Sequence, residues 1–158
     1  MLQKITTNKS AGRGGSYAII ASKYNALYVD AMLRAAKSEI RRAGGKVQIV
    51  RVPGAYEIPV VAARLARQSA ADGRFSAIIC LGVILRGATT HAQHIGEAVS
   101  NALSQIQIQH EVPLIHEVLL LENHQQARER CLDKDHNRGR EAAQTALEMA
   151  RVMRSLRP

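Results

Sequence analysis

The stretch AIICLGVIL, residues 77–85, contains no polar side chain. A β-strand alternates its side chains between the two faces of a sheet, so a strand that is apolar throughout is covered on both faces. Strands of this kind belong to parallel sheets, because the crossover helices of a parallel sheet supply the cover. The stretch therefore predicts a central strand of an α/β protein.

The segments on either side of this strand alternate between strand and helix patterns. Short apolar or alternating runs predict strands at YAIIA (17–21), KVQIVRV (46–52) and PLIHEVLLL (113–121). Apolar positions at helical spacing predict helices at about 24–43, 57–70, 90–109, 124–131 and 138–156. Gly44 and Gly45 end the first helix, and Pro59 fits the second because it lies in the first turn.

This order of elements, β-α-β-α-β-α-β-α-α, predicts the fold class. Strands that alternate with helices across short loops form a parallel sheet with helices on both faces. We expect a three-layer αβα sandwich with a four-stranded parallel sheet, flavodoxin-like in outline. A flexible basic arm at residues 1–15 precedes a single domain at residues 16–158.

Length and composition exclude several classes of protein. The chain has 158 residues, of which 46% are hydrophobic, so it forms one domain and needs no disulfide or metal to support its core. Cys80 and Cys131 lie far apart without a CxxC motif and are typical of reduced thiols in a cytosolic protein. The sequence contains no run of about 18 apolar residues, which a membrane-spanning helix would need, and its N-terminus lacks the apolar core of a signal peptide.

The net charge of +9 leaves the class of binding partner open. Residues 1–51 carry ten Lys or Arg and two acidic residues, a balance that fits nucleic acid, an anionic substrate or solubility alone. The basic residues are spread over several elements, and aromatic residues make up only 3% of the chain, so nucleic acid is disfavoured.

The segment RGATTH, residues 86–91, carries the densest chemical signal. Ligands of an open α/β sheet bind beyond the carboxyl ends of its strands, and this segment follows the central strand. Thr90 and Gln93 have the spacing of a capping box, and Gly87 allows a ligand to approach the backbone. Free N–H groups at such a helix start suit a phosphate, although a capped helix without a ligand has the same sequence pattern.

His91 stands at the start of this helix. The helix dipole disfavours the charged imidazole there, which suits a proton-accepting base, although a surface histidine fits the same pattern. His91 and His94 could form half of a metal site, but no cysteine cluster or HExxH motif completes it.

Four arginines flank the loop CLDKDHN between the last two helices: Arg128, Arg130, Arg138 and Arg140. They form either a solvated face, paired with neighbouring acidic residues, or a clamp for an anion. Local spacing does not decide between the two.

Taken together, these segments resemble the lumazine synthase family, from Tyr17 to about Met153. The resemblance rests on four blocks in order: Tyr24-Asn25, VPGAYEIP (52–59), LGVILRGATTH (81–91) and QARER…NRGREAA (126–143). It implies a transferase of riboflavin biosynthesis that condenses 5-amino-6-(D-ribitylamino)uracil with 3,4-dihydroxy-2-butanone 4-phosphate. The alternative is a non-catalytic flavin- or phosphate-binding shell protein on the same fold.

The resemblance also implies a role for each site residue, without a metal or other cofactor. His91 transfers protons. The residues that bind the ribitylaminouracil are Tyr24, Asn25, Ala55, Tyr56, Glu57, Val83, Ile84, Leu85 and His116. The residues that bind the phosphate are Gly87, Ala88, Thr89, Arg130 and Arg138, with Glu141 as the partner of Arg138.

The family's active sites lie between adjacent subunits, so the expected partners are copies of this chain, in a pentamer or an icosahedral assembly of pentamers. Riboflavin synthase is a further candidate partner, and we expect neither nucleic acid nor a membrane. The arm at residues 1–15 could pair with a neighbour's sheet edge.

Several positions depart from the family pattern. Tyr24 replaces Phe or Trp, Ala92 replaces an aromatic residue, and Arg138 replaces Lys. Leu121-Glu122 replaces a Thr pair, and His116-Glu117 replaces an aromatic residue and Gly. The last departure puts substrate affinity, or its pH dependence, in doubt.

Overall fold

The computed structural model describes residues 2–5 and 14–158, and its elements follow the predicted order. The strands are β1 (Ser16–Ser22), β2 (Lys46–Val52), β3 (Ala77–Leu85) and β4 (Leu114–Leu121). The helices are α1 (Ala26–Arg42), α2 (Ile58–Asp72), α3 (His91–His110), α4 (His124–Cys131) and α5 (Arg138–Ser155), with a 3₁₀ turn η1 (Ala55–Glu57) before α2. Within the described residues, four parallel strands form one sheet in the order β2-β1-β3-β4, which confirms the predicted fold class.

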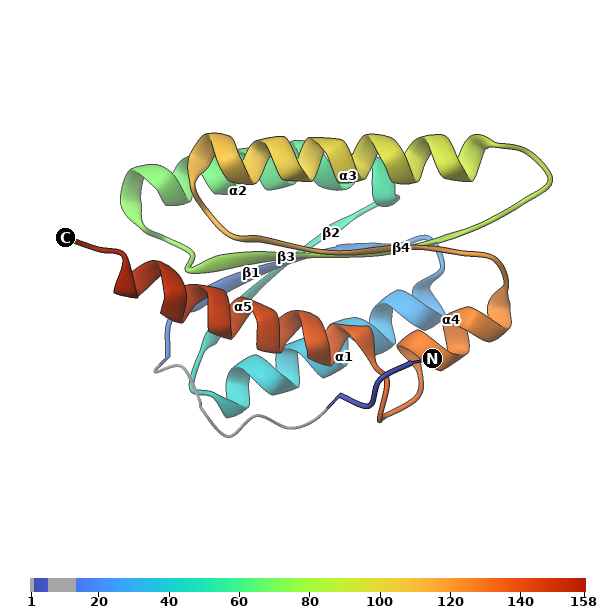
Figure 1. The fold of residues 1–158 in the computed structure, drawn as a ribbon, viewed down its shortest axis with the longest axis horizontal. Helices are drawn as coiled ribbons and strands as arrows, with labels where there is room; N and C mark the ends of the chain where they lie inside the picture. Colours follow the sequence, from blue (N-terminus) through green and yellow to red (C-terminus); the bar gives the residue numbers. More distant parts are fainter. Residues whose placement is uncertain (1, 6–13) are drawn as a thin grey trace.

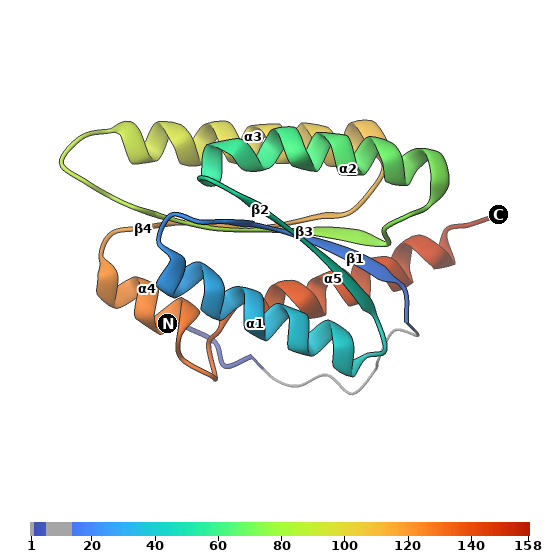
Figure 2. The ribbon, with the colours of Figure 1, turned by 180° about the vertical axis from the view of Figure 1, so that it is seen from behind.

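Helices cover both faces of the sheet (Figure 1). The helices α2 and α3 lie on one face, and α1, α4 and α5 lie on the other, as the view from behind also shows (Figure 2). The side chains of β3 alternate between the two cores: Ile79 and Leu81 pack toward α1 and α5, whereas Ile78 and Cys80 pack toward α2 and α3. The continuous apolar run of β3 is thus explained by burial on both faces.

The strand order places a topological switch between β1 and β3. From β1 the chain passes through α1 to β2 on one side, and from β3 it passes through α3 to β4 on the other. The connections leave in opposite directions, so a crevice opens between them at the carboxyl ends of the strands.

The predicted boundaries agree with the structure to within two residues, and the structure explains the shift at the start of the first helix. The predicted helix 24–43 begins at Ala26, because Asn25 adopts a left-handed conformation with φ of 57°. At the other end, Gly44 has φ of 80°, and its N–H donates to the Arg41 carbonyl at 2.9 Å, which ends α1 as predicted. The remaining boundaries differ by no more than two residues.

The predicted arm, residues 1–15, falls largely outside the described residues. Of its described part, Ile5 donates its N–H to the Asp135 carbonyl at 2.7 Å, and Lys4 Nζ lies 3.5 Å from Asp135 Oδ1. This segment therefore lies against the loop between α4 and α5. Over the described residues, none of the helices has the length and apolar character that a membrane span requires.

Cys80 and Cys131 are free and buried. Burial raises the pKa of each thiol to about 12, so both remain protonated near neutral pH.

Two helical glycines should respond to alanine in opposite ways. A Cβ at Gly139 would lie 2.1 Å from the Met32 carbonyl oxygen, because α5 crosses α1 with its backbone in contact there. We expect Gly139→Ala to reduce the free energy of unfolding by roughly 1–3 kcal/mol or more, because neither helix backbone can yield. Thermal denaturation measures the effect.

Gly96→Ala is the matched control. A Cβ at Gly96 would make an ordinary contact with Leu120 at 3.6 Å. Alanine there should raise stability by about 0.5–1 kcal/mol through helix propensity. Equal effects of the two substitutions would contradict the close contact between α1 and α5.

Candidate functional site

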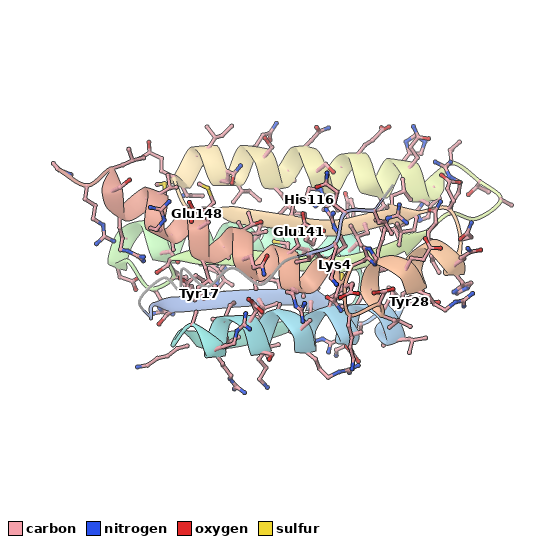
Figure 3. The ribbon with its side chains drawn as sticks, turned by 60° about the horizontal axis from the view of Figure 1, so that its bottom comes forward. Lys4, Tyr17, Tyr28, His116, Glu141 and Glu148 are labelled. Carbon is pink, nitrogen blue, oxygen red and sulfur yellow. The ribbon has the colours of Figure 1, made fainter. Side chains whose placement is uncertain are left out.

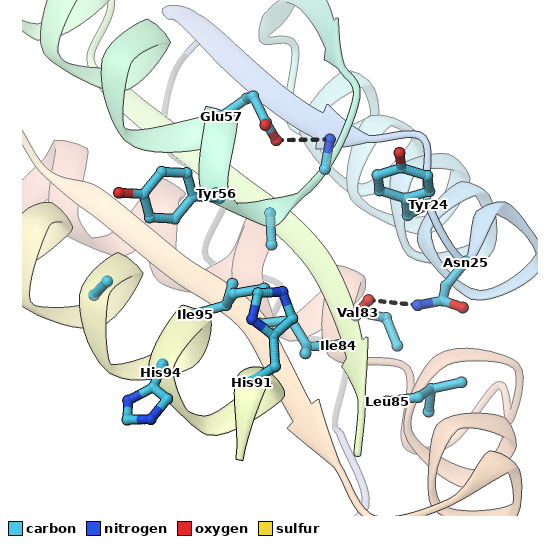
Figure 4. A pocket seen from close by; sticks show the side chains of 13 residues that line it. Tyr24, Asn25, Tyr56, Glu57, Val83, Ile84, Leu85, His91, His94 and Ile95 are labelled. Carbon is cyan, nitrogen blue, oxygen red and sulfur yellow. Dashed lines mark hydrogen bonds between the residues drawn. The ribbon is translucent and has the colours of Figure 1, made fainter. Parts of the chain in front are cut away.

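A crevice of about 780 Å³ opens at the carboxyl ends of β1, β2 and β3 (Figure 4). Most of the predicted substrate residues line it: Tyr24, Asn25, Ala55, Tyr56, Glu57, Val83, Ile84, Leu85 and His91. The structure adds four residues to this lining: Gly54, His94, Ile95 and Ala98. Segments distant in sequence therefore meet in one concave site.

The turn after β1 is fixed by Asn25. Its Nδ2 donates to the Val83 carbonyl at 2.7 Å, which ties the turn to β3. Asparagine tolerates the left-handed backbone that the turn requires. Tyr24, one residue earlier, is 70% exposed, and its ring lies so close to Gly54 that a Cβ there would meet it at 2.8 Å. The turn therefore presents an aromatic ring at the crevice wall.

The turn after β2 is fixed by Glu57. Its Oε2 accepts a hydrogen bond from the Gly54 N–H at 3.0 Å, which closes the 3₁₀ turn. The Glu57 side chain is exposed to the crevice, where its carboxylate can accept further hydrogen bonds. Tyr56 stands beside it and is 65% exposed.

The end of β3 provides main-chain groups. Pairing between β1 and β3 ends at Ala21 and Leu81, so β3 extends beyond β1 through Leu85. Along this extension β3 pairs only with β4 among the described strands, and its other edge faces the crevice. Such an edge can read the donors and acceptors of a planar ring.

The start of α3 differs from the prediction, because the capping box of Thr90 and Gln93 is wrong. Within the described residues, the Thr90 side chain makes no capping hydrogen bond to the helix; its Oγ1 lies 3.3 Å from His94 Nε2 instead. Gln93 donates its side-chain amide to Glu97 at 2.9 Å. Thr90 also has a ψ of 2°, whereas an N-cap residue normally has extended backbone. Thr90 therefore leaves the N–H groups that an N-cap residue normally binds, those of the second and third helical residues, without its hydroxyl.

His91 occupies the first position of α3, and Figure 4 shows its imidazole pointing into the crevice between Ile84 and Ile95. The three missed residues of this helix, His94, Ile95 and Ala98, follow His91 by three, four and seven positions. This spacing places all four on one helical face. Helical periodicity, applied from His91, could have found them.

The loop between β3 and α3 carries the predicted phosphate residues Gly87, Ala88 and Thr89, which lie outside the crevice lining. Thr89 Oγ1 accepts the His91 N–H at 3.4 Å. At the root of the loop, Arg86 Nε lies 3.0 Å from Glu122 Oε1. This ion pair links the ends of β3 and β4.

The remaining predicted residues lie away from this crevice. His116 lies on β4 (labelled in Figure 3). Its Nε2 lies 2.8 Å from Ser100 Oγ of α3, and its Nδ1 accepts the Val118 N–H. Burial lowers the pKa of His116, so the neutral imidazole is favoured. Arg130 lies on α4, across the sheet from α3.

Arg138 and Glu141 form an ion pair at 2.9 Å, as the family resemblance implies. Arg138 Nε also lies 3.2 Å from Oε2 of the buried Glu117. Arg138 and Glu141 border a separate cavity of about 410 Å³, together with residues 2–5; Figure 3 labels Glu141 and Lys4. Among the described residues, no three His, Cys, Asp or Glu side chains are grouped as a metal site would require.

Two comparisons with known proteins bear on this arrangement. Residues 14–154 match the model of a family described as 6,7-dimethyl-8-ribityllumazine synthase. A protein from Aquifex aeolicus (strain VF5), named 6,7-dimethyl-8-ribityllumazine synthase, is 38% identical over 157 residues, which cover 98% of this chain and 99% of that protein.

The buried Glu117 should make stability depend on pH. Burial raises the pKa of this carboxyl group to about 7, although the Arg138 guanidinium opposes the shift. A folded-state pKa above the unfolded value stabilises the protein at low pH, and this stabilisation is lost as the pH rises toward and through 7. We expect the melting temperature of the wild type to fall between pH 5 and pH 8 more than that of Glu117→Gln.

The exposed Glu129 provides a control for this measurement. Glu129→Gln should follow the wild-type pH dependence. If Glu117→Gln followed it as well, ionisation of Glu117 would not govern stability over this range.

Proposed function

The chain belongs to the 6,7-dimethyl-8-ribityllumazine synthase family, and we propose that the crevice at the carboxyl ends of β1, β2 and β3 is its active site. The enzyme is a transferase of riboflavin biosynthesis. It condenses 5-amino-6-(D-ribitylamino)uracil with 3,4-dihydroxy-2-butanone 4-phosphate and releases 6,7-dimethyl-8-ribityllumazine, phosphate and water. The comparisons give no support to the alternative of a non-catalytic shell protein.

The ribitylaminouracil binds with its pyrimidine ring against Tyr24. The exposed ring of Tyr24 offers an apolar surface for stacking. The backbone of Val83, Ile84 and Leu85 reads the edge of the pyrimidine, because β3 extends beyond β1 there. Asn25 supports this arrangement through its bond to the Val83 carbonyl.

The ribityl chain binds along Ala55, Tyr56 and Glu57. Glu57 accepts hydrogen bonds from its hydroxyl groups with the carboxylate oxygen that Gly54 leaves free. Hydrogen bonds to charged groups contribute about 1.5–3 kcal/mol each, so this carboxylate favours a polyhydroxylated chain over one without hydroxyl groups.

The phosphate of the second substrate binds at Gly87, Ala88 and Thr89, beside the start of α3. The N–H groups that Thr90 leaves uncapped and the positive end of the helix dipole favour a dianion there. Arg130 of a neighbouring subunit completes the phosphate site. Arg138, supported by its ion pair with Glu141, is a further phosphate-binding residue, and His116 packs beside the substrate bound in a neighbour's crevice.

His91 moves the protons of the reaction. The amine of one substrate attacks the ketone of the other, water leaves to form an imine, phosphate is eliminated, and the second nitrogen closes the ring with loss of a second water. Each step transfers a proton to or from nitrogen or oxygen, and His91 faces the crevice where these atoms meet.

The active unit is a homo-oligomer, a pentamer or a larger icosahedral assembly, with riboflavin synthase as a candidate partner in the cytoplasm. Two observations support assembly. Val60 on α2 and Ile108 on α3 are 71% and 72% exposed, which suits a contact surface. Arg130, the cation that the phosphate requires, lies across the sheet from the crevice of its own chain.

The observation that carries this proposal is the convergence of Tyr24, Glu57 and His91 with the β3 edge in one crevice. Mixing the purified protein with both substrates and following the absorbance of the lumazine product tests the function. Absence of product from a folded protein would overturn it.

Removing the imidazole should slow the reaction without stopping it. A positioned acid or base contributes about 10²–10⁴-fold, whereas alignment of two substrates contributes up to roughly 7–11 kcal/mol. We expect His91→Ala to lower kcat within the first range, and His110→Ala, at the far end of α3, to leave it unchanged. Complete loss of turnover, with a normal fold and normal substrate binding, would refute the idea that alignment of the two substrates provides most of the rate enhancement.

Co-expression of two variants tests whether the site is shared. His91→Ala and Arg130→Ala should each be impaired alone. Random mixed assemblies should regain about a quarter of wild-type activity, because about one site in four combines an intact His91 of one chain with an intact Arg130 of its neighbour. Mixing His91→Ala with Glu57→Gln should give no such recovery, because both lie in the same crevice. Failure of the first mixture to recover would show that Arg130 does not act across subunits.

A further inference from the structure

We propose that His94 is a positioning residue that holds the Thr90 side chain away from the first N–H groups of α3 and so keeps them open to substrate phosphate. This inference rests on the phosphate site of the proposed function. It concerns a histidine that lines the crevice beside His91 but has no part in the assignments above.

The geometry at the start of α3 supports this role. Thr90 occupies the N-cap position, where a threonine normally accepts a hydrogen bond from the second or third N–H of the helix. Here Thr90 Oγ1 lies 3.3 Å from His94 Nε2. The backbone of Thr90 has φ of −78° and ψ of 2°, which is not the extended conformation of a capping residue.

The Thr90 hydroxyl therefore has two competing partners, the imidazole of His94 and the N–H groups of α3. When His94 binds the hydroxyl, the N–H groups remain available to an anion. When the imidazole is removed, Thr90 can extend and cap the helix. Phosphate must then displace the threonine, and the loop of Gly87, Ala88 and Thr89 changes direction with the ψ angle of Thr90.

Other side chains near this turn do not replace His94. Gln93, which a capping box would require, donates its side-chain amide to Glu97. Thr89 accepts the His91 N–H at 3.4 Å and so already contacts the first helical residue. His94 is thus the side chain that decides the position of the Thr90 hydroxyl.

The affinity for inorganic phosphate, measured by calorimetry and as inhibition competitive with the sugar phosphate, tests this role in the assembled enzyme. His94→Leu keeps a bulky side chain in the crevice but cannot bind the hydroxyl. We expect its phosphate affinity to fall about fivefold, which corresponds to the ~1 kcal/mol typical of a threonine cap. The KM for the sugar phosphate should rise in parallel, with a smaller change in kcat.

Two further variants separate positioning from direct contact. The double variant Thr90→Ala with His94→Leu has no capping side chain, so its phosphate affinity should return toward that of the wild type. His94→Gln retains a hydrogen-bonding group and should bind phosphate as the wild type does. His110→Gln, at the C-terminal end of α3, controls for the loss of an imidazole elsewhere on the helix.

Thermal stability gives an independent readout. His94→Leu should melt a few degrees above the double variant, because only the single variant can form the cap. A merely structural role for His94 would lower stability and affinity together.

The outcomes are distinct. Unchanged phosphate affinity in His94→Leu would overturn the inference, and so would reduced affinity that Thr90→Ala does not restore, since His94 would then contact the phosphate itself. A wild-type enzyme that forms no lumazine, or binds no phosphate, would instead overturn the proposed function.

Discussion

The burial of β3 on both faces is the constraint on which the rest of the structure depends. A strand without polar side chains requires cover above and below, and helices supply this cover when they connect parallel strands. Here β3 passes through α3 to β4 on one side, while β1 passes through α1 to β2 on the other. The crevice between β1 and β3 follows from this divergence, and it places ligand-binding groups at strand ends, where loops can vary without disturbing the core.

Three short turns convert that crevice into a chemical site, and each is fixed by a different local interaction. A left-handed Asn25 joins the first turn to Val83, and a carboxylate of Glu57 closes the second on Gly54. The third, at the start of α3, is held by a contact between Thr90 and His94 in place of a helix cap. Each turn uses one side-chain group for its own structure, while Tyr24, the second carboxylate oxygen of Glu57 and the imidazole of His91 remain to face a ligand.

The sequence predicted the fold and the crevice wall better than it predicted individual hydrogen bonds. The bounds of β3 and α4 agree with the structure, since an uninterrupted apolar run and clear turn signals leave little ambiguity. The capping box failed because the Thr90 hydroxyl had a competing partner four residues away, which spacing alone does not weigh. The sequence motif suggests His94 only as half of a metal site, although its spacing from His91 along the helix places both in the crevice. His116 on β4 and Arg130 on α4 lie away from the crevice of their own chain, so their proposed roles depend on contacts between chains, which sequence patterns within one chain do not predict.

The separation of Arg130 from the crevice has a topological origin. A right-handed crossover from β3 to β4 places α3 on one face of the sheet, and after β4, the last described strand, the chain continues into α4 on the opposite face. Within one chain, Arg130 on α4 and the helix α3 therefore lie on opposite faces of the sheet. In its own chain the guanidinium nearest along the sequence, Arg86, already pairs with Glu122 at 3.0 Å, and we propose that Arg130 of a second copy neutralises the phosphate. The placement of α3 and α4 on opposite faces is thus the structural argument for the proposed sharing of the phosphate site between two copies of the chain.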